Sequence, residues 1–145
     1  MTYSTIVVGT DGSDSSMLAV ERAATIAGVF NAHLIIGCAY YESEEEASKT
    51  LRKDSIVVLG DDPAQRNLDK AAEAARKAGA TNITTEIKPG TPVEALMSIV
   101  TAHDADLLVV GNRGINTLTG RLLGSVPADV ARQSHCDVMI VHTVS

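Results

Sequence analysis

A glycine-rich segment stands between the most apolar stretch of the chain and a predicted helix. It reads Gly111-Asn112-Arg113-Gly114, followed by nine residues and then Gly124-Ser125. Glycine adopts positive φ and lets a ligand approach backbone N–H groups closely, and the free N–H groups of a helix N-terminus bind phosphate. The spacing therefore favours a site for phosphate or ribose. A simple chain turn, followed by a helix cap at Ser125, would produce the same pattern.

A second polar segment follows the first apolar stretch and reads Gly9-Thr10-Asp11-Gly12-Ser13-Asp14-Ser15-Ser16. Its small, hydroxylated residues could face phosphates or a ribose. A carboxylate at this place accepts hydrogen bonds from ribose hydroxyls or holds a phosphate-bound cation, which makes Asp11 a candidate. An Asx turn and a helix cap would account for Asp14, Ser15 and Ser16 without a ligand, whereas Asp11 precedes the cap.

The elements that must position these segments alternate along the chain. Short apolar stretches predict strands at 5–10, 33–40, 83–87, 106–111 and 137–142. The pattern at 83–87 is the weakest of the five, which suits a strand at the edge of a sheet. Start and stop residues predict helices at 16–27, from Asp62-Pro63 to Gly79, from Thr91-Pro92 onward, and at 125–133. Residues 41–61 show no regular pattern, and the acidic run Glu42–Glu46 is interpreted as a solvated loop.

Alternating strands and helices predict an α/β fold with a parallel sheet and helices on both faces. Aromatic residues make up only 3% of the 145 residues, so the core must be aliphatic. The first helix is expected to bury Leu18, Val20, Ala23, Ala24 and Ala27. The length suits a single domain over residues 1–145. Ligands of such sheets bind beyond the carboxyl ends of the strands, where the strand order reverses, so the two polar segments are expected to meet there.

Composition argues against several classes of function. The net charge of −6, without a basic run, argues against nucleic-acid binding. No apolar stretch approaches the length of a membrane span, so we expect no membrane partner and a cytoplasmic protein. Cys38 and Cys136 lack the spacing of a metal or disulfide motif. The four histidines fall at element ends rather than together, so no metal site is expected.

The two polar segments together resemble the universal stress protein family. Nucleotide-binding members carry G-x2-G-x9-G-(S/T), and Gly111, Gly114, Gly124 and Ser125 match this motif without a gap. The stretches IVVGTDGSDSS, ADLLVVGNRG and CDVMIVHT are similar to the first, fourth and last strands of the family. The resemblance covers essentially the whole chain and is weakest at 41–61. It implies a Rossmann-like, adenine nucleotide α-hydrolase-like fold, an open five-stranded parallel sheet of order 3-2-1-4-5.

The resemblance also implies a ligand, either ATP or another adenine nucleotide such as cyclic AMP, with Mg²⁺ accompanying ATP. The glycine motif would hold ribose and phosphates, Asp11 would contact either of them, and the backbone of Ala39 would read the adenine. Arg113 would meet a phosphate or solvent. The full set of residues assigned to the nucleotide is Gly9, Thr10, Asp11, Ala39, Val110, Gly111, Arg113, Gly114, Gly124, Ser125 and Val126.

Three functions remain open at this point. The first is a nucleotide-responsive binding module in stress responses, with no catalytic residues and at most weak ATP hydrolysis. The second is a slow ATPase or adenylyl-transferring enzyme on the same fold. The third is a ligand-free interaction protein, against which the intact glycine motif speaks. A P-loop is excluded, because Gly120–Ser125 is one residue short and lacks the Lys.

A homodimer is expected through the last strand, Asp137–His142. The apolar run Val138–Val141 carries no Lys, Pro or other guard of a free edge. An antiparallel partner strand related by a twofold axis would satisfy that edge.

Overall fold

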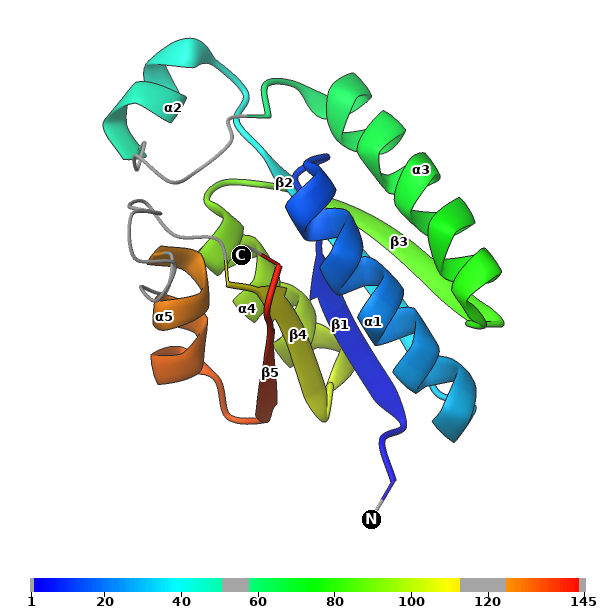
Figure 1. Cartoon of the computed structure of the whole chain (residues 1–145). Coiled ribbons are helices and arrows are strands. Elements are labelled where there is room, and N and C mark those ends of the chain that lie inside the picture. Colours follow the sequence, from blue (N-terminus) through cyan, green and yellow to red (C-terminus); the bar gives the residue numbers. More distant parts are fainter. Residues whose placement is uncertain (1, 51–57, 113–124, 144–145) are drawn as a thin grey trace.

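The computed structural model describes residues 2–50, 58–112 and 125–143. Its sheet has the expected order β3-β2-β1-β4-β5, with every neighbouring pair parallel (Figure 1). The strands are β1 (Thr5–Gly9), β2 (His33–Tyr40), β3 (Asn82–Pro89), β4 (Leu107–Gly111) and β5 (Asp137–Val141). The helices are α1 (Asp14–Phe30), α2 (Glu44–Thr50), α3 (Asp61–Ala78), α4 (Pro92–His103) and α5 (Ser125–Gln133).

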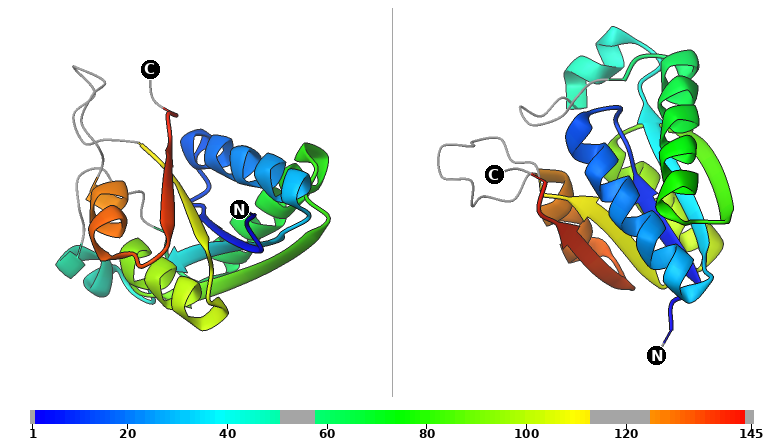
Figure 2. Two further views of the ribbon diagram at one scale, coloured as in Figure 1. Left: turned by 90° about the horizontal axis from the view of Figure 1, so that it is seen from below. Right: turned by 45° about the vertical axis from the view of Figure 1, so that its right-hand side comes forward.

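The sheet separates two layers of helices, as Figure 2 shows. Helices α1 and α3 pack together on one face, and α4 and α5 pack together on the other. In the central strand β1, Ile6 and Val8 point to the first layer and Val7 to the second, and all three are fully buried. Because both faces of a central parallel strand are covered, its sequence is a continuous apolar run rather than an alternating one.

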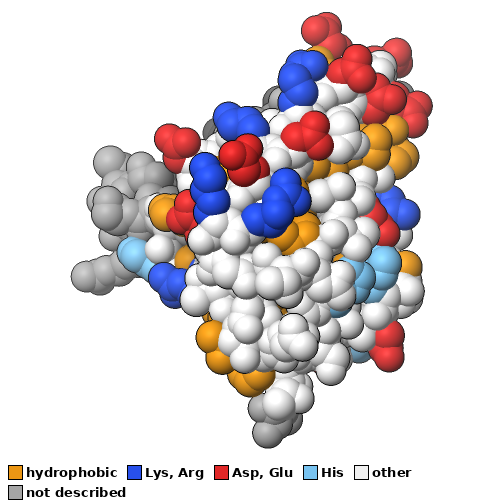
Figure 3. Space-filling view, turned by 90° about the vertical axis from the view of Figure 1, so that its right-hand side faces the viewer, with side chains coloured by type: hydrophobic (Ala, Val, Ile, Leu, Met, Phe, Trp, Pro, Cys, Tyr) orange, Lys and Arg blue, Asp and Glu red, His pale blue; other side chains and the backbone are white. Residues whose placement is uncertain are grey.

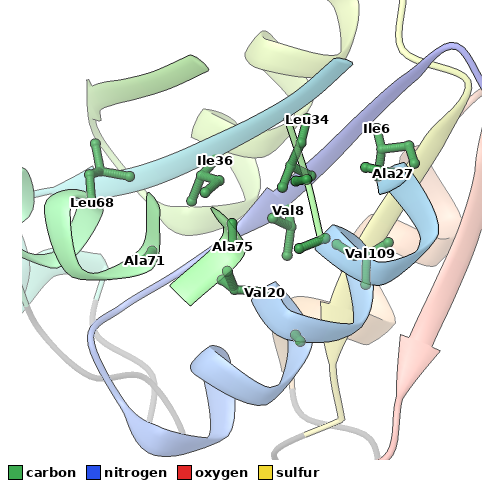
Figure 4. Close-up of a cluster of buried hydrophobic side chains, with 14 of the residues drawn as sticks. Ile6, Val8, Val20, Ala27, Leu34, Ile36, Leu68, Ala71, Ala75 and Val109 are labelled. Carbon is green, nitrogen blue, oxygen red and sulfur yellow. The ribbon is translucent and has the colours of Figure 1, made fainter. Parts of the chain in front are cut away.

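The core between the sheet and α1 and α3 is aliphatic, as expected (Figure 4). Small residues of α3, Ala71 and Ala75, face Ile36 and Val20 there and let the helix lie close to the sheet. The prediction for Leu18 was wrong, because its side chain is 48% exposed. The buried stripe of α1 is Ala19, Val20, Ala23, Ala24 and Ala27. At 3.6 residues per turn, Leu18 lies on the opposite side of the helix from the centre of that stripe.

Local signals set the helix ends. The Thr91 hydroxyl accepts a hydrogen bond from the Glu94 N–H at 3.2 Å, which confirms the predicted start of α4. Gly79, at a φ of 120°, ends α3 as predicted. Helix α1 is longer at both ends than predicted, because Ser13 caps its start and Asn31 adopts a left-handed conformation at its end.

The interpretation of Glu42–Glu46 as a loop was wrong, because Glu44 begins helix α2. The Ser43 hydroxyl accepts from the Glu46 N–H at 3.1 Å, and the Glu46 carboxylate accepts from the Glu42 N–H at 3.2 Å. This arrangement is a variant of a capping box, whose Ser-x-x-Glu pattern was present in the sequence. Three acidic side chains in the first turn also suit the positive end of the helix dipole.

Acidic and basic side chains are interspersed on the face of the molecule that carries α3 (Figure 3). One pair on this helix, Lys77 and Glu73, lies at 3.5 Å with both side chains largely exposed. An exposed ion pair of this kind contributes at most about 1 kcal/mol to the free energy of unfolding. Its charges are solvated, so we interpret this face as a helix surface in contact with solvent. Within the described ranges, no helix combines the length and the apolar character that crossing a membrane requires.

Candidate functional site

A pocket opens at the carboxyl ends of β1, β2 and β4, beside the point where the strand order reverses. It encloses about 890 Å³ of empty space, part of it open to solvent. The sheet forms the floor of the pocket. Helices α4 and α5 form one wall, and the segment from β1 to α1 forms the opposite wall. The predicted residues around it are Gly9, Thr10, Asp11, Ala39, Val110, Gly111 and Val126. The structure thus brings together segments that are far apart in the sequence.

The floor of the pocket exists because β1 is shorter than β2. The Thr10 N–H donates to the Gly37 carbonyl at 2.9 Å, and there the pairing between the two strands stops. Backbone groups of alternate residues in a parallel strand point to opposite sides. Because the Gly37 carbonyl points toward β1, the peptide groups of Ala39 point the same way, into the space beyond the end of β1. Among the described residues, the Ala39 carbonyl receives a weak contact from the Cys38 thiol, at 3.6 Å.

The wall from α4 is apolar and lies close to the sheet. It consists of Pro92, Ala95, Leu96 and Ile99. Two glycines permit this approach: a Cβ added to Gly9 would lie 3.0 Å from Leu96 Cδ2, and one added to Gly37 would lie 2.5 Å from Ile99 Cδ1. The far end of α4 is tied to β3 by a hydrogen bond of 2.6 Å between His103 and Glu86. The pocket therefore has an apolar side that suits an aromatic ring.

The wall between β1 and α1 is polar and tightly bonded within itself. The Thr10 and Ser16 hydroxyls lie 3.0 Å apart, and the Gly12 N–H donates to the Thr10 hydroxyl at 3.1 Å. The Asp11 carboxylate accepts from the Ser13 N–H at 2.9 Å, which is an Asx turn. The turn expected for this segment is therefore present, but the side chain that forms it is Asp11. Its carboxylate still lines the pocket.

Sequence reasoning missed part of the lining. Tyr41 and Val58 close one end of the pocket, and both are almost fully buried. The Tyr41 N–H donates to the Val58 carbonyl at 2.8 Å, and its own carbonyl accepts from the Gly60 N–H at 2.9 Å. No periodic pattern marks 41–61, and the local signals are Tyr41 and the short apolar run Ile56–Leu59 in an otherwise polar stretch. The remaining missed residues are Ser13, Ser15, Ser16, Gly37, Pro92, Ala95, Leu96, Ile99 and Pro127.

The described lining holds the Asp11 carboxylate and no basic side chain. Cys38 lies on the other face of β2, in the core beneath α1 and α3. Burial raises the pKa of its thiol to about 11, although a contact from the Asn67 amide acts in the opposite direction. The thiol is therefore protonated at neutral pH and is a poor nucleophile. No group of three or more His, Cys, Asp or Glu within the described ranges could hold a metal ion.

Several predicted residues fall outside the described part of the chain. These are Arg113, Gly114 and Gly124. Helix α5 begins at Ser125, the last residue of the glycine motif, and its next residue, Val126, lines the pocket. The roles assigned to the motif as a whole stay predictions.

Comparisons with known proteins identify the family and support the fold. The family model described as "Universal stress protein family" matches residues 2–142. A universal stress protein of Mycobacterium tuberculosis H37Rv is 52% identical over 143 residues, covering 97% of each chain. A crystal structure of a universal stress protein in complex with cAMP is 48% identical, with a TM-score of 0.80 and 99% of each chain covered. A universal stress protein of Archaeoglobus fulgidus, 22% identical with a TM-score of 0.69 over 97% of this chain and 98% of its own, shares the fold. The chain belongs to the universal stress protein family.

Proposed function

We propose that this protein is a nucleotide-responsive binding module that holds an adenine nucleotide in the pocket between α4 and the β1–α1 segment. The observation that carries the proposal is the open end of β2, where the Ala39 peptide faces the pocket beside an apolar wall. A backbone N–H and C=O on one edge match the acceptor and the amine of adenine, and the apolar wall matches its ring. The similar protein solved with cAMP supports this class of ligand.

The polar wall and the glycine motif would hold the rest of the nucleotide. Asp11 accepts hydrogen bonds and therefore suits ribose hydroxyls, or Mg²⁺ if ATP is bound. The N-terminus of α5, which directly follows the motif, suits a phosphate. The described lining offers no cation to offset the several charges of ATP. Among the candidate ligands, cyclic AMP is the one with which a similar protein was solved.

The first test is direct. Protein purified from cells is denatured, and any released nucleotide is identified by chromatography and mass. Ligand-free protein is then titrated calorimetrically with cyclic AMP, AMP, ATP and ATP with Mg²⁺. We expect micromolar dissociation constants for at least one adenine nucleotide and no binding of the matching guanine nucleotide. Absence of heat for every adenine nucleotide, with folded protein, contradicts the proposal.

We expect no appreciable turnover of ATP. Hydrolysis needs a positioned water and a base or metal clamp, and Asp11 is the only carboxylate in the described lining. That carboxylate is also engaged by the Ser13 N–H. Phosphate release is measured on tag-free protein beside the Asp11→Ala variant. If each wild-type molecule instead releases several phosphates per second, linearly with time, and the variant does not, the protein is a slow ATPase.

We propose further that the module is a homodimer joined through β5, and that nucleotide occupancy alters this or another partner surface in stress responses. The edge of β5 is partly open: Ile140 is 36% exposed, and Val138 and Met139 are half-buried. The last strand ends directly beside the pocket, because Gly111 of β4 is paired with Val141.

A further inference from the structure

A chain of hydrogen bonds runs from the pocket to the end of the last strand. The hydroxyls of Ser15, which lines the pocket, and Thr143, which follows β5, lie 2.5 Å apart. The Thr143 hydroxyl lies 3.2 Å from Oδ1 of Asn112, and Nδ2 of Asn112 lies 2.9 Å from Nδ1 of His142. Figure 1 shows why this is possible: β4 and β5 end beside the start of α1.

The orientation of the Asn112 amide is fixed within this chain. The Thr143 N–H donates to Oδ1 of Asn112 at 2.7 Å, so an amide turned the other way would place two donors face to face. Oδ1 is therefore the atom near the Thr143 hydroxyl. An amide oxygen only accepts, so the Thr143 hydroxyl must donate to it.

This orientation determines where the Ser15 proton goes. A hydroxyl has one proton, and that of Thr143 is committed to Asn112. Ser15 must then donate in the short bond to Thr143, and only its lone pairs remain for the pocket. Beside it, Ser16 donates to the Ser13 carbonyl at 2.9 Å, so Thr10 donates to Ser16. The Ser16 hydroxyl also accepts from the Asp11 N–H at 3.3 Å, so its bonds stay within the wall. The acceptors that this wall offers to the pocket are therefore the Ser15 hydroxyl oxygen and the Asp11 carboxylate.

Gly111 allows this arrangement. A Cβ at this position would lie 3.2 Å from Oγ1 of Thr143 and 3.7 Å from Oγ of Ser15. The first glycine of the motif therefore leaves room for the two hydroxyls on the α1 side of the sheet.

We infer that Ser15 is a specificity-determining residue that accepts a hydrogen bond from a ribose hydroxyl, with Thr143 and Asn112 as the positioning residues that orient its proton. The inference rests on the proposed nucleotide binding. An adenine nucleotide has donors only at its exocyclic amine and its ribose hydroxyls, since its phosphates are ionised. The amine belongs with the Ala39 carbonyl on the floor, so the Ser15 and Asp11 acceptors are left for the ribose. The protein should therefore prefer ribonucleotides to deoxyribonucleotides.

The test uses ligand pairs that differ in one hydroxyl. The probes are cyclic AMP with 2′-deoxy cyclic AMP, and ATP with its 2′-deoxy and 3′-deoxy forms. Wild-type protein should bind at least one deoxy form more weakly by about 5–10-fold, the equivalent of one hydrogen bond. Ser15→Ala should remove this ratio by weakening ribonucleotide binding alone. Thr143→Val should reduce the ratio of ribonucleotide to deoxyribonucleotide affinity, because Ser15 is then free to turn its proton to the pocket. Thr143→Ser keeps the hydroxyl and should restore the ratio.

The matched control is Thr25→Val, also on α1, whose hydroxyl donates to the Glu21 carbonyl of the same helix at 2.9 Å. It should leave the ribose-to-deoxyribose ratio unchanged. Because the measured quantity is a ratio, a general loss of stability does not imitate the result. Equal affinity for ribose and deoxyribose forms in the wild type overturns the inference while the proposed function stands, as does a ratio that survives Ser15→Ala. A wild-type protein that binds no adenine nucleotide overturns both.

Discussion

Replacing Ala39 with Leu is expected to lower adenine-nucleotide affinity by at least about 100-fold, the equivalent of about 3 kcal/mol of overpacking. The reason is geometric. The side chain of residue 39 faces the pocket beside the α4 wall, and a Leu there occupies the space proposed for the base. Ala39→Gly removes the side chain but keeps the backbone groups, so its affinity should stay within a few-fold of the wild type.

Calorimetric titration of both variants, with thermal melting to establish that each is folded, checks this prediction. The paired variants separate filling of the pocket from other effects of a changed strand. If a folded Ala39→Leu protein binds as tightly as the wild type, the base lies elsewhere. A similar loss in Ala39→Gly would show that the methyl group, not the peptide, makes the contact.

Ile140→Pro is expected to convert the protein from a dimer to a monomer of 15.2 kDa. The Val141 carbonyl accepts from the Asn112 N–H at 3.0 Å, so the peptide groups of Val141 face β4. Those of Ile140 therefore face the open edge. Proline at an outward-facing edge position removes a donor to a partner strand without removing a bond to β4. Val141→Pro, in contrast, should destabilise the fold itself.

The matched control is Thr85→Pro on β3, the opposite edge of the sheet. The Tyr40 carbonyl accepts from the Gly90 N–H at 2.9 Å, so the peptide groups of Thr85 point away from β2. This variant disturbs an edge in the same way and should remain dimeric. Light scattering after size exclusion gives the masses. A folded Ile140→Pro dimer would move the interface to another surface, and a wild-type monomer across micromolar concentrations would refute the dimer.

The fold could be predicted from the sequence because its signals are local. Runs such as Ile6–Val8 and Leu107–Val110 are too apolar to be exposed, and capping residues such as Thr91 and Gly79 mark helix ends within a few residues. The order of the strands is not local information. It came from the resemblance to a family, and the pairings of β1 with β2 and β4 confirm it.

Errors arose where burial depends on a partner distant in the sequence. Leu18 is apolar and helical, yet it is exposed, because the sheet contacts the opposite side of α1. Tyr41 and Val58 lie in a stretch without periodicity, and both are buried where a parallel bridge joins Tyr41 to Leu59. No spacing rule identifies such residues before the chain is folded.

The sequence by itself determined the alternation of strands and helices and the two polar segments at strand ends. Both features depend on the types of residues that are close in the sequence, because such residues determine the local backbone conformation and the capping of helix ends. Only the tertiary structure determined that β1 stops short of Ala39, that α4 supplies an apolar wall, and which peptides of β5 face outward. It also determined the direction of the Ser15 proton, because Thr143 and Asn112 are near Ser15 only through sheet pairing. Hydrogen-bond direction and wall shape depend on neighbours in space, which residue type and spacing do not specify.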